Sequence, residues 1–260
     1  MIGVFDSGVG GLSVWKELHA LMPEEGYVYF SDSAFCPYGP KPAEAVRARV
    51  ALITDFLISK GAGMVVVACN TATAAAISWL RSRYDIPFVG MEPAVKPAVQ
   101  YTKSGVVGVL ATAGTLKGSL YLHTLANFAG SVKVVEEVGT GLVELVESGN
   151  TDSPEAFALV SKYVKPMVEA GADNIVLGCT HYPFLLGPIQ RAAGPGVAVI
   201  NPAPAVARQA QRLLPASDAS SRGRRGSAVF YSSSDTGVMQ ELVRGIDPKG
   251  EYEFEGNVKL

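Results

Sequence analysis

The stretch that decides the fold is residues 63–76, GMVVVACNTATAAA. Met64 to Val67 is a short, β-branched apolar run, which is typical of a strand buried on both faces of a parallel sheet. The Ala-rich segment from Thr71 to Leu80 predicts a helix capped by Asn70 or Thr71. Cys69 therefore falls where a strand ends and a helix begins, the edge at which open α/β sheets bind ligands.

The position of Cys69 alone leaves two roles open. Many free cysteines are small buried apolar residues, whereas a helix N-terminus favours a reactive thiolate. A second occurrence favours the reactive role, because residues 174–183, NIVLGCTHYP, repeat the order of apolar strand, small residue, cysteine and helix start. Cys179 follows Cys69 by about 110 positions, and Gly3–Ser7 matches Gly108–Thr112 at a similar offset.

Two units that recur in the same order predict two similarly built halves. We predict an α/β fold class with two similar three-layer domains, mainly parallel sheets and pseudo-symmetry about an interdomain cleft. Residues 1–93 plus 205–260 are predicted to form the first domain, with Asp6 and Cys69. Residues 94–204 are predicted to form the second, with Cys179 and His181. The polar, basic segment 215–226 predicts a surface loop.

Composition narrows the class of protein. The chain has 260 residues, 48% of them hydrophobic, and a formal net charge of −2, so no electrostatic footprint for nucleic acid or an anionic membrane is present. Three cysteines without close pairs argue against a disulfide framework and indicate a reducing compartment, by default the cytoplasm. The N-terminus lacks the basic region of a signal peptide, and polar residues interrupt the most apolar window, residues 63–80.

A glycine-rich turn, DSGVGG at residues 6–11, follows the first predicted strand. It matches neither the dinucleotide fingerprint nor a phosphate loop. The carboxylate of Asp6 and the hydroxyl of Ser7 suit an ammonium group or a proton relay, although either residue is also a good helix cap. In the loop at residues 32–40, Tyr38 and Gly39 offer a hydroxyl and a backbone N–H to a ligand.

Two thiols at matching strand ends would face each other across the cleft. No C-x-x-C motif supports disulfide exchange, and the spacing of Cys69, Cys179 and His181 does not suggest zinc, so we expect no metal. The remaining use is proton transfer on opposite faces of one carbon, with one thiol as base and the other as acid, which is racemisation. No cofactor motif is evident, so polar groups and backbone N–H donors must stabilise the carbanion.

Five segments resemble the cofactor-independent glutamate racemases, in the same order and across essentially the whole chain: GVFDSGVGGLSV, DSAFCPYG, VVACNTATA, ATAGT and GCTHYPFL. The resemblance implies two α/β domains with an active site at their interface. It also implies a cytoplasmic isomerase that interconverts L- and D-glutamate and supplies the D-isomer for peptidoglycan. The partner would be this small-molecule substrate, with no nucleic acid or membrane, and a homodimer stays open.

The resemblance also implies roles for individual residues. Cys69 would be the base on the D-glutamate side, supported by Asp6, and Cys179 the base on the L side, supported by His181. Glu147 would be a further acidic residue near His181. The implied substrate contacts are mostly hydroxyls and backbone amides: Ser7, Pro37, Tyr38, Gly39, Asn70, Thr71, Thr112, Thr115 and Thr180.

Two positions depart from the family pattern. Cys36, beside Pro37, is interpreted as a bystander, and Asn201-Pro202 stands where the family often has Asp-Ser, which leaves the placement of the following helix open.

Two alternative functions remain open. The substrate could be aspartate or another amino acid, or the protein could be a non-catalytic amino-acid-binding regulator. His181 favours glutamate, because related aspartate-type enzymes tend to carry an acidic residue there.

Overall fold

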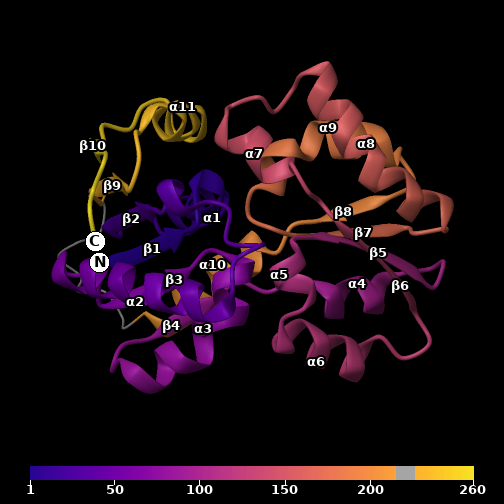
Figure 1. Cartoon of the computed structure of the whole chain (residues 1–260), viewed down its shortest axis with the longest axis horizontal. Helices are drawn as coiled ribbons and strands as arrows, with labels where there is room; N and C mark the ends of the chain where they lie inside the picture. Colours follow the sequence, from indigo (N-terminus) through magenta and orange to yellow (C-terminus); the bar gives the residue numbers. More distant parts are fainter. Residues whose placement is uncertain (215–225) are drawn as a thin grey trace.

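The computed structural model describes residues 1–214 and 226–260, so nearly all of the loop predicted at 215–226 lies outside the described residues (Figure 1). The described strands form two separate parallel sheets. The first sheet has, in spatial order, β10 (Glu253–Glu255), β9 (Ala228–Ser232), β2 (Tyr27–Ser31), β1 (Ile2–Asp6), β3 (Met64–Val67) and β4 (Phe88–Gly90). The second has β6 (Lys133–Val138), β5 (Val106–Ala111), β7 (Asn174–Gly178) and β8 (Ala198–Ile200).

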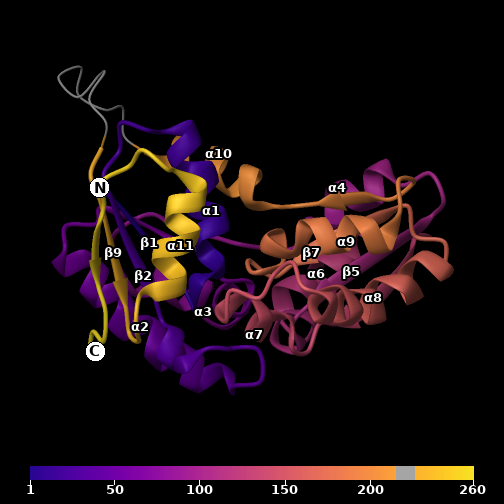
Figure 2. The same ribbon diagram turned by 90° about the horizontal axis from the view of Figure 1, so that it is seen from above.

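Helices cover both faces of the first sheet (Figures 1 and 2). One face carries α1 (Leu12–Leu21), α10 (Ala203–Leu213) and α11 (Gly237–Ile246), and the other carries α2 (Ala43–Ser59) and α3 (Asn70–Arg83). Strand alternation explains the division, since Val4 packs with the α1 side while Phe5 packs with the α2 side. The result is a three-layer unit.

The second sheet is built in the same way. Its two helical layers consist of α8 (Pro154–Glu169) with α9 (Leu186–Ala193), and α4 (Val95–Tyr101) with α6 (Ser119–Phe128). Short helical segments link strands to helices, namely α5 (Ala113–Leu116), α7 (Leu142–Glu147) and the 3-10 turns Val9–Gly11, Ser33–Phe35 and Tyr182–Leu185. The predicted fold class, two three-layer α/β units with parallel sheets, is confirmed.

Strand register places the functional segments at one edge of each sheet. Asp6 pairs with Ser31 and Phe5 with Val67, so β1, β2 and β3 end side by side. In the second sheet Ala111 pairs with Gly178, so the segments that follow β5 and β7 are neighbours as well. The carboxyl ends of parallel strands therefore gather the polar residues that follow them.

One local prediction needs correction. The helix after β3 begins at Asn70, and its cap is neither Asn70 nor Thr71 but Cys69, whose sulfur accepts a hydrogen bond from the Ala72 N–H at 3.4 Å. After β5 the chain forms the short helix α5, which Thr112 caps through the Thr115 N–H at 3.3 Å, and then α6.

The helix after Asn201-Pro202, left open by the sequence, is α10. It begins at Ala203, whose N–H donates to Asn201 Oδ1 at 3.0 Å, and it packs against α1 of the first sheet. One apolar cluster runs from α1 through Leu142 and Tyr182 of the second unit, so the two units share a continuous core.

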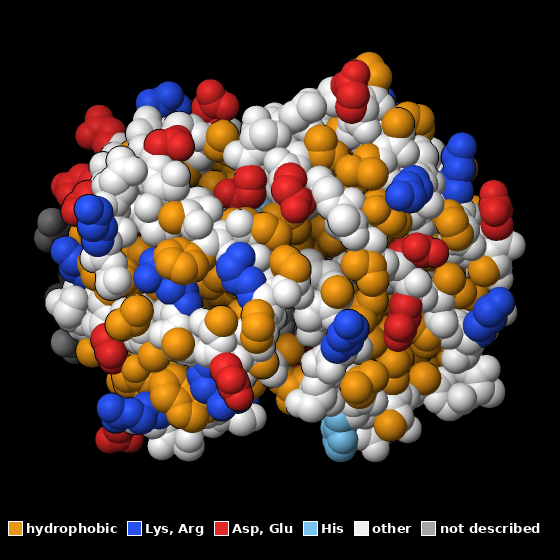
Figure 3. Space-filling model, viewed as in Figure 1, with side chains coloured by type: hydrophobic (Ala, Val, Ile, Leu, Met, Phe, Trp, Pro, Cys, Tyr) orange, Lys and Arg blue, Asp and Glu red, His pale blue; other side chains and the backbone are white. Residues whose placement is uncertain are grey.

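The surface carries mixed charge. On the face in Figure 3, acidic and basic side chains are interspersed. Among the helices of residues 1–214 and 226–260, none has the length and apolar character needed to cross a membrane.

A buried ion pair fixes the loop after β2. The Asp32 carboxylate, which has no exposed surface, accepts two hydrogen bonds from the Arg49 guanidinium of α2, each 2.8 Å. It also accepts the Tyr38 hydroxyl at 2.6 Å. Two neighbouring elements thus hold Tyr38 in place, although no sequence pattern predicted the pairing of Asp32 with Arg49.

Replacing Arg49 with Ala should destabilise the protein by about 3 kcal/mol, because it leaves a buried carboxylate with one neutral partner. Arg191→Ala is the matched control, since Arg191 and Asp152 form an exposed pair at 3.4 Å whose loss should cost less than about 1 kcal/mol. Urea unfolding with fitted midpoints and slopes measures both. Equal stability losses in the two variants would contradict this account.

Candidate active site

The two sulfur atoms lie at the ends of corresponding strands. Cys69 follows β3 of the first sheet, and Cys179 follows β7 of the second. The thiol of Cys69 donates to Ser7 Oγ at 3.8 Å, and Cys179 Sγ lies 3.8 Å from His181 Nδ1. Both thiols are buried, and both line one cavity between the two units.

Almost all of the predicted site residues line this cavity. Besides the thiols and His181, its lining includes all nine predicted substrate contacts: Ser7, Pro37, Tyr38, Gly39, Asn70, Thr71, Thr112, Thr115 and Thr180. Val143 and Gly178, which the sequence did not single out, complete the lining. Asp6 and Glu147 are not part of the wall and reach the cavity only through the residues they contact.

Asp6 is a fully buried carboxylate at the junction of the two units. Its Oδ2 accepts the Gly11 N–H at 2.7 Å and the Thr180 hydroxyl at 3.2 Å. Burial raises the pKa of Asp6, and the nearby positive charge of His181 only partly offsets this effect. Asp6 is therefore placed to accept or release a proton beside Cys69 and His181.

His181 and Glu147 form an ion pair. His181 Nε2 donates to Glu147 Oε1 at 2.6 Å, and Glu147 also accepts the Val9 N–H at 2.7 Å and the Ser33 hydroxyl at 3.2 Å. Burial lowers the pKa of His181, but the hydrogen bonds to Cys179 and Glu147 and the charge of Asp6 outweigh it and raise the pKa well above its usual value. Burial raises the pKa of Glu147, yet His181 brings it below the usual value.

Gly10 holds the imidazole ring in this orientation. A Cβ on Gly10 would lie 2.2 Å from His181 Nδ1 and 2.6 Å from both Cγ and Cε1, distances that place it over the face of the ring. The Gly10 N–H, 3.3 Å from Nε2, therefore approaches from the ring face. The in-plane hydrogen of Nε2 is left for Glu147, and only glycine leaves room for this contact.

The environment of Cys69 differs from that of Cys179. Burial raises the pKa of Cys69 well above its usual value, and the charge of Asp6 raises it further. The Ala72 N–H acts in the opposite direction but does not compensate. Cys69 is therefore a thiol at neutral pH.

Hydroxyl groups link the two units on the other side of the cavity. Thr71 Oγ1 and Thr112 Oγ1 are 2.9 Å apart, and Thr112 Oγ1 is 3.0 Å from Thr115 Oγ1. The amide of Asn70 donates to the Met91 carbonyl at 3.5 Å, while its buried Oδ1 has no hydrogen-bond partner among residues 1–214 and 226–260. The cavity thus offers hydroxyl donors and an unused acceptor.

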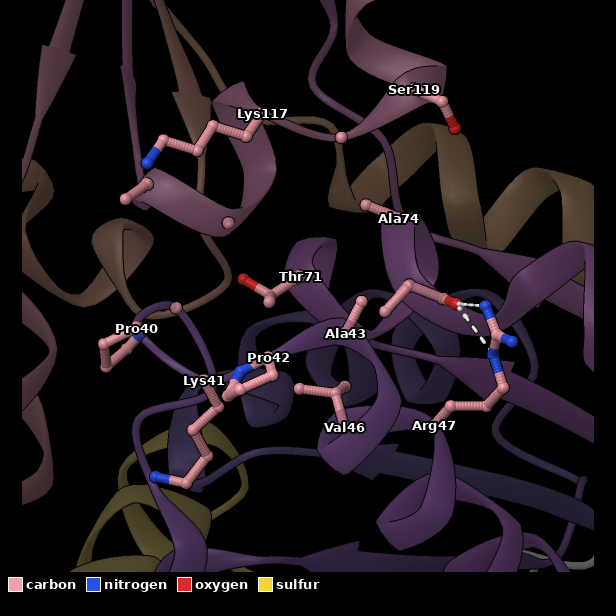
Figure 4. A pocket seen from close by; sticks show the side chains of 15 residues that line it. Pro40, Lys41, Pro42, Ala43, Val46, Arg47, Thr71, Ala74, Lys117 and Ser119 are labelled. Carbon is pink, nitrogen blue, oxygen red and sulfur yellow. Dashed lines mark hydrogen bonds between the residues drawn. The ribbon is translucent and has the colours of Figure 1, made fainter.

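A larger cavity of about 540 Å³ adjoins this one and shares Gly39 and Thr71 with it. Its charged lining residues are all basic: Lys41, Arg47 and Lys117. The Arg47 guanidinium donates to the Ala75 carbonyl at 3.3 and 3.4 Å (Figure 4). This basic lining favours anionic ligands near the site.

Some residues near the site had no predicted role. Asp32 and Ser33 come directly after β2, and Asp6 and Ser7 stand at the end of β1, so a repeated Asp-Ser pair was a usable signal in the sequence. Cys36, interpreted as a bystander, lies near His181 and Glu147, with one ligand atom from each of the three residues within 4.8 Å of the other two. No sequence pattern indicated this proximity, because Cys36 and His181 are 145 positions apart.

Fold and site together define an α/β enzyme with two thiols at the interface of two similar units. Residues 2–210 match the family described as Asp/Glu/Hydantoin racemase, and the chain belongs to this family of isomerases. The glutamate racemase of Herpetosiphon aurantiacus is 48% identical over 235 residues, 90% of this chain and 92% of the relative. That of Methylococcus capsulatus is 48% identical over 238 residues, 91% and 88% of the two chains.

Solved structures agree with this family assignment. A glutamate racemase of Bacillus anthracis matches with a TM-score of 0.86 at 29% identity, covering 100% of this chain and 97% of that one. The Escherichia coli glutamate racemase in complex with L-glutamate and the activator UDP-MurNAc-Ala matches with a TM-score of 0.85 at 30% identity, covering 98% and 97%. The resemblance to glutamate racemases is confirmed.

Glu147→Gln should lower the pKa of His181, because it removes the negative charge that stabilises the imidazolium. In the unaltered protein the ring should stay protonated as the pH rises past about 6.5, the ordinary histidine value. Long-range ¹H–¹⁵N NMR of labelled histidine reports the protonation state. The matched control is Glu144→Gln, the same change one turn earlier on α7 at an exposed position. An identical His181 titration in Glu147→Gln and the unaltered protein would refute the ion pair.

Proposed function

We propose that this protein interconverts L- and D-glutamate by a two-base mechanism in which Cys69 and Cys179 act on opposite faces of the α-carbon. The observation that carries the proposal is that two thiols, from equivalent strand ends of two similar units, line one cavity. A protein that only binds an amino acid has no need of such a pair.

The reaction balances without an outside reagent. One cysteine, as thiolate, takes the α-proton, and the electron pair left on carbon is delocalised into the adjacent carboxylate. The other cysteine, still a thiol, gives its proton to the opposite face, so the product is the mirror image and the protonation of the two sulfurs has exchanged. We assign Cys69 to the D-glutamate side and Cys179 to the L side.

The groups behind the sulfurs suit different tasks. The His181 imidazolium, held by Glu147, supports negative charge on Cys179 and supplies a proton to it. Cys69 has the Asp6 carboxylate as its neighbour, so it loses a proton only when positive charge arrives. The α-ammonium group of a bound amino acid would provide that charge, which couples the base to the presence of substrate.

Glutamate is the proposed substrate for two reasons. The most similar relatives reported above are glutamate racemases, and the E. coli protein was solved with L-glutamate. The lining also offers suitable partners, since the buried Asn70 Oδ1 can accept from an ammonium group, and the hydroxyls of Thr71, Thr112 and Thr115 can donate to a carboxylate.

Several wider features belong to the same proposal. Residues 1–93 with 205–260, and residues 94–204, would act as two domains that close on the substrate. The chemistry needs neither a cofactor nor a metal. The protein would work in the cytoplasm, where D-glutamate enters peptidoglycan synthesis.

The deciding experiment is solvent deuterium incorporation into L- and D-glutamate by the purified protein without added cofactor. The unaltered protein should label the α-carbon and racemise both isomers. Cys69→Ser and Cys179→Ser should each lose at least about 10³-fold in racemisation, because a serine hydroxyl is a far weaker acid than a thiol. Either variant should still exchange the proton of one enantiomer through the remaining thiol.

Cys36→Ser is the matched control, since Cys36 is the third cysteine and is not part of the cavity lining. It should keep activity within about twofold of the unaltered protein. Full activity in Cys69→Ser or Cys179→Ser would rule out the two-base mechanism. If a panel of amino acids showed faster turnover of aspartate than of glutamate, the two-base mechanism would still hold, but the proposed substrate would be aspartate.

A further inference from the structure

Cys36, which has no role in the proposed racemisation, lies beside the ion pair of His181 and Glu147. One ligand atom from each of these three residues lies within 4.8 Å of the other two. The donors are a thiol, an imidazole nitrogen and a carboxylate oxygen, the combination that binds Zn²⁺ best among common cations. Cys36 comes from the loop after β2, Glu147 from α7 and His181 from the turn after β7.

We infer that Cys36, Glu147 and His181 form an inhibitory site for Zn²⁺ beside the catalytic cavity. The inference rests on the proposed function only in its consequence, because metal binding itself requires no turnover. The set predicted to be unsuitable for zinc, Cys69 with Cys179 and His181, is a different one and shares only the histidine.

A tetrahedral site would require a rearrangement of the cluster. Zinc–ligand bonds of about 2.0–2.3 Å put neighbouring ligand atoms about 3.3–3.7 Å apart. His181 Nε2 and Glu147 Oε1, now 2.6 Å apart, would need to separate by roughly 1 Å, which requires the Glu147 side chain to rotate away from the ring. Gly10 lies over the face of the imidazole and so leaves the in-plane lone pair of Nε2 accessible once its proton is gone.

Two of the three residues in the cluster are partly exposed. His181 is buried, but the side chain of Glu147 keeps 19% of its surface exposed, and Cys36 is half-buried. We expect zinc to enter from the side of these two residues and to hold a water molecule as its fourth ligand.

Binding would replace protons with the metal. Zn²⁺ would displace one proton from the Cys36 thiol and the shared proton between His181 and Glu147, and both protons pass to solvent. With Nε2 on the metal, the ring can no longer accept the second proton that makes it an imidazolium beside Cys179. Catalysis should stop although substrate contacts such as Thr71 and Asn70 stay intact.

The test uses Co²⁺ as a spectroscopic substitute for Zn²⁺. The full-length protein should bind one equivalent tightly and show the near-ultraviolet absorption of a thiolate–cobalt bond, and Zn²⁺ should inhibit racemisation. In Cys36→Ser the absorption should disappear, and the half-inhibiting zinc concentration should rise about tenfold or more. Each half-inhibiting concentration is measured relative to the zinc-free activity of the same variant. Mg²⁺, which avoids sulfur ligands, should not inhibit either protein.

His123→Gln is the matched control, because His123 is exposed on α6 and offers zinc a surface ligand unrelated to the cluster. Its zinc sensitivity should equal that of the unaltered protein. Undiminished sensitivity or absorption in Cys36→Ser would overturn the inference and place the metal on the catalytic thiols. If the protein showed no racemase activity but still showed cobalt absorption that depends on Cys36, the proposed function would be refuted and the metal site would be supported.

Discussion

The ion pair between His181 and Glu147 is the interaction on which the rest of the site depends. Both groups are largely removed from water, and a buried charge is tolerated only with a partner and further hydrogen bonds. Those additional bonds come from the other half of the molecule, from the Val9 N–H and the Ser33 hydroxyl, while Gly10 packs on the ring. The charge is therefore satisfied only when the two units are docked as they are here.

This arrangement makes assembly of the active site and docking of the two units the same event. Ser13 of α1 donates to the Thr180 carbonyl at 2.8 Å, and Thr180 in turn donates to Asp6, so polar contacts cross the interface on both sides of the histidine. Separating the units would expose His181 and leave Asp6 with fewer donors. The apolar cluster that runs through both units adds area, but only the polar contacts fix which residues face each other.

The sequence predicted the features that depend on local patterns. An apolar run located β3 with its observed bounds, Met64 to Val67, and a second run located the strand before Cys179, so the parallel arrangement then required Cys69 and Cys179 to lie at corresponding edges. Contacts between distant segments were not predictable in this way. The pairing of Asp32 with Arg49 and the proximity of Cys36 to His181 depend on how loops fold back over the edge of the sheet. Hydrophobic periodicity in the sequence does not predict such folding. The sulfur cap of α3 was missed because cysteine is not a common capping residue.

The two halves repeat each other in fold but differ in the charge behind each thiol. The Asp6 carboxylate lies close to Cys69, whereas the protonated imidazole of His181 lies 3.8 Å from the sulfur of Cys179. Burial and the charge of Asp6 raise the pKa of Cys69, so this sulfur holds its proton in the absence of substrate. Under the proposed mechanism, the ammonium group of a bound amino acid would bring the positive charge that favours ionisation of Cys69. The proposed reaction would thus use two halves of similar fold whose thiols are supported by groups of opposite charge.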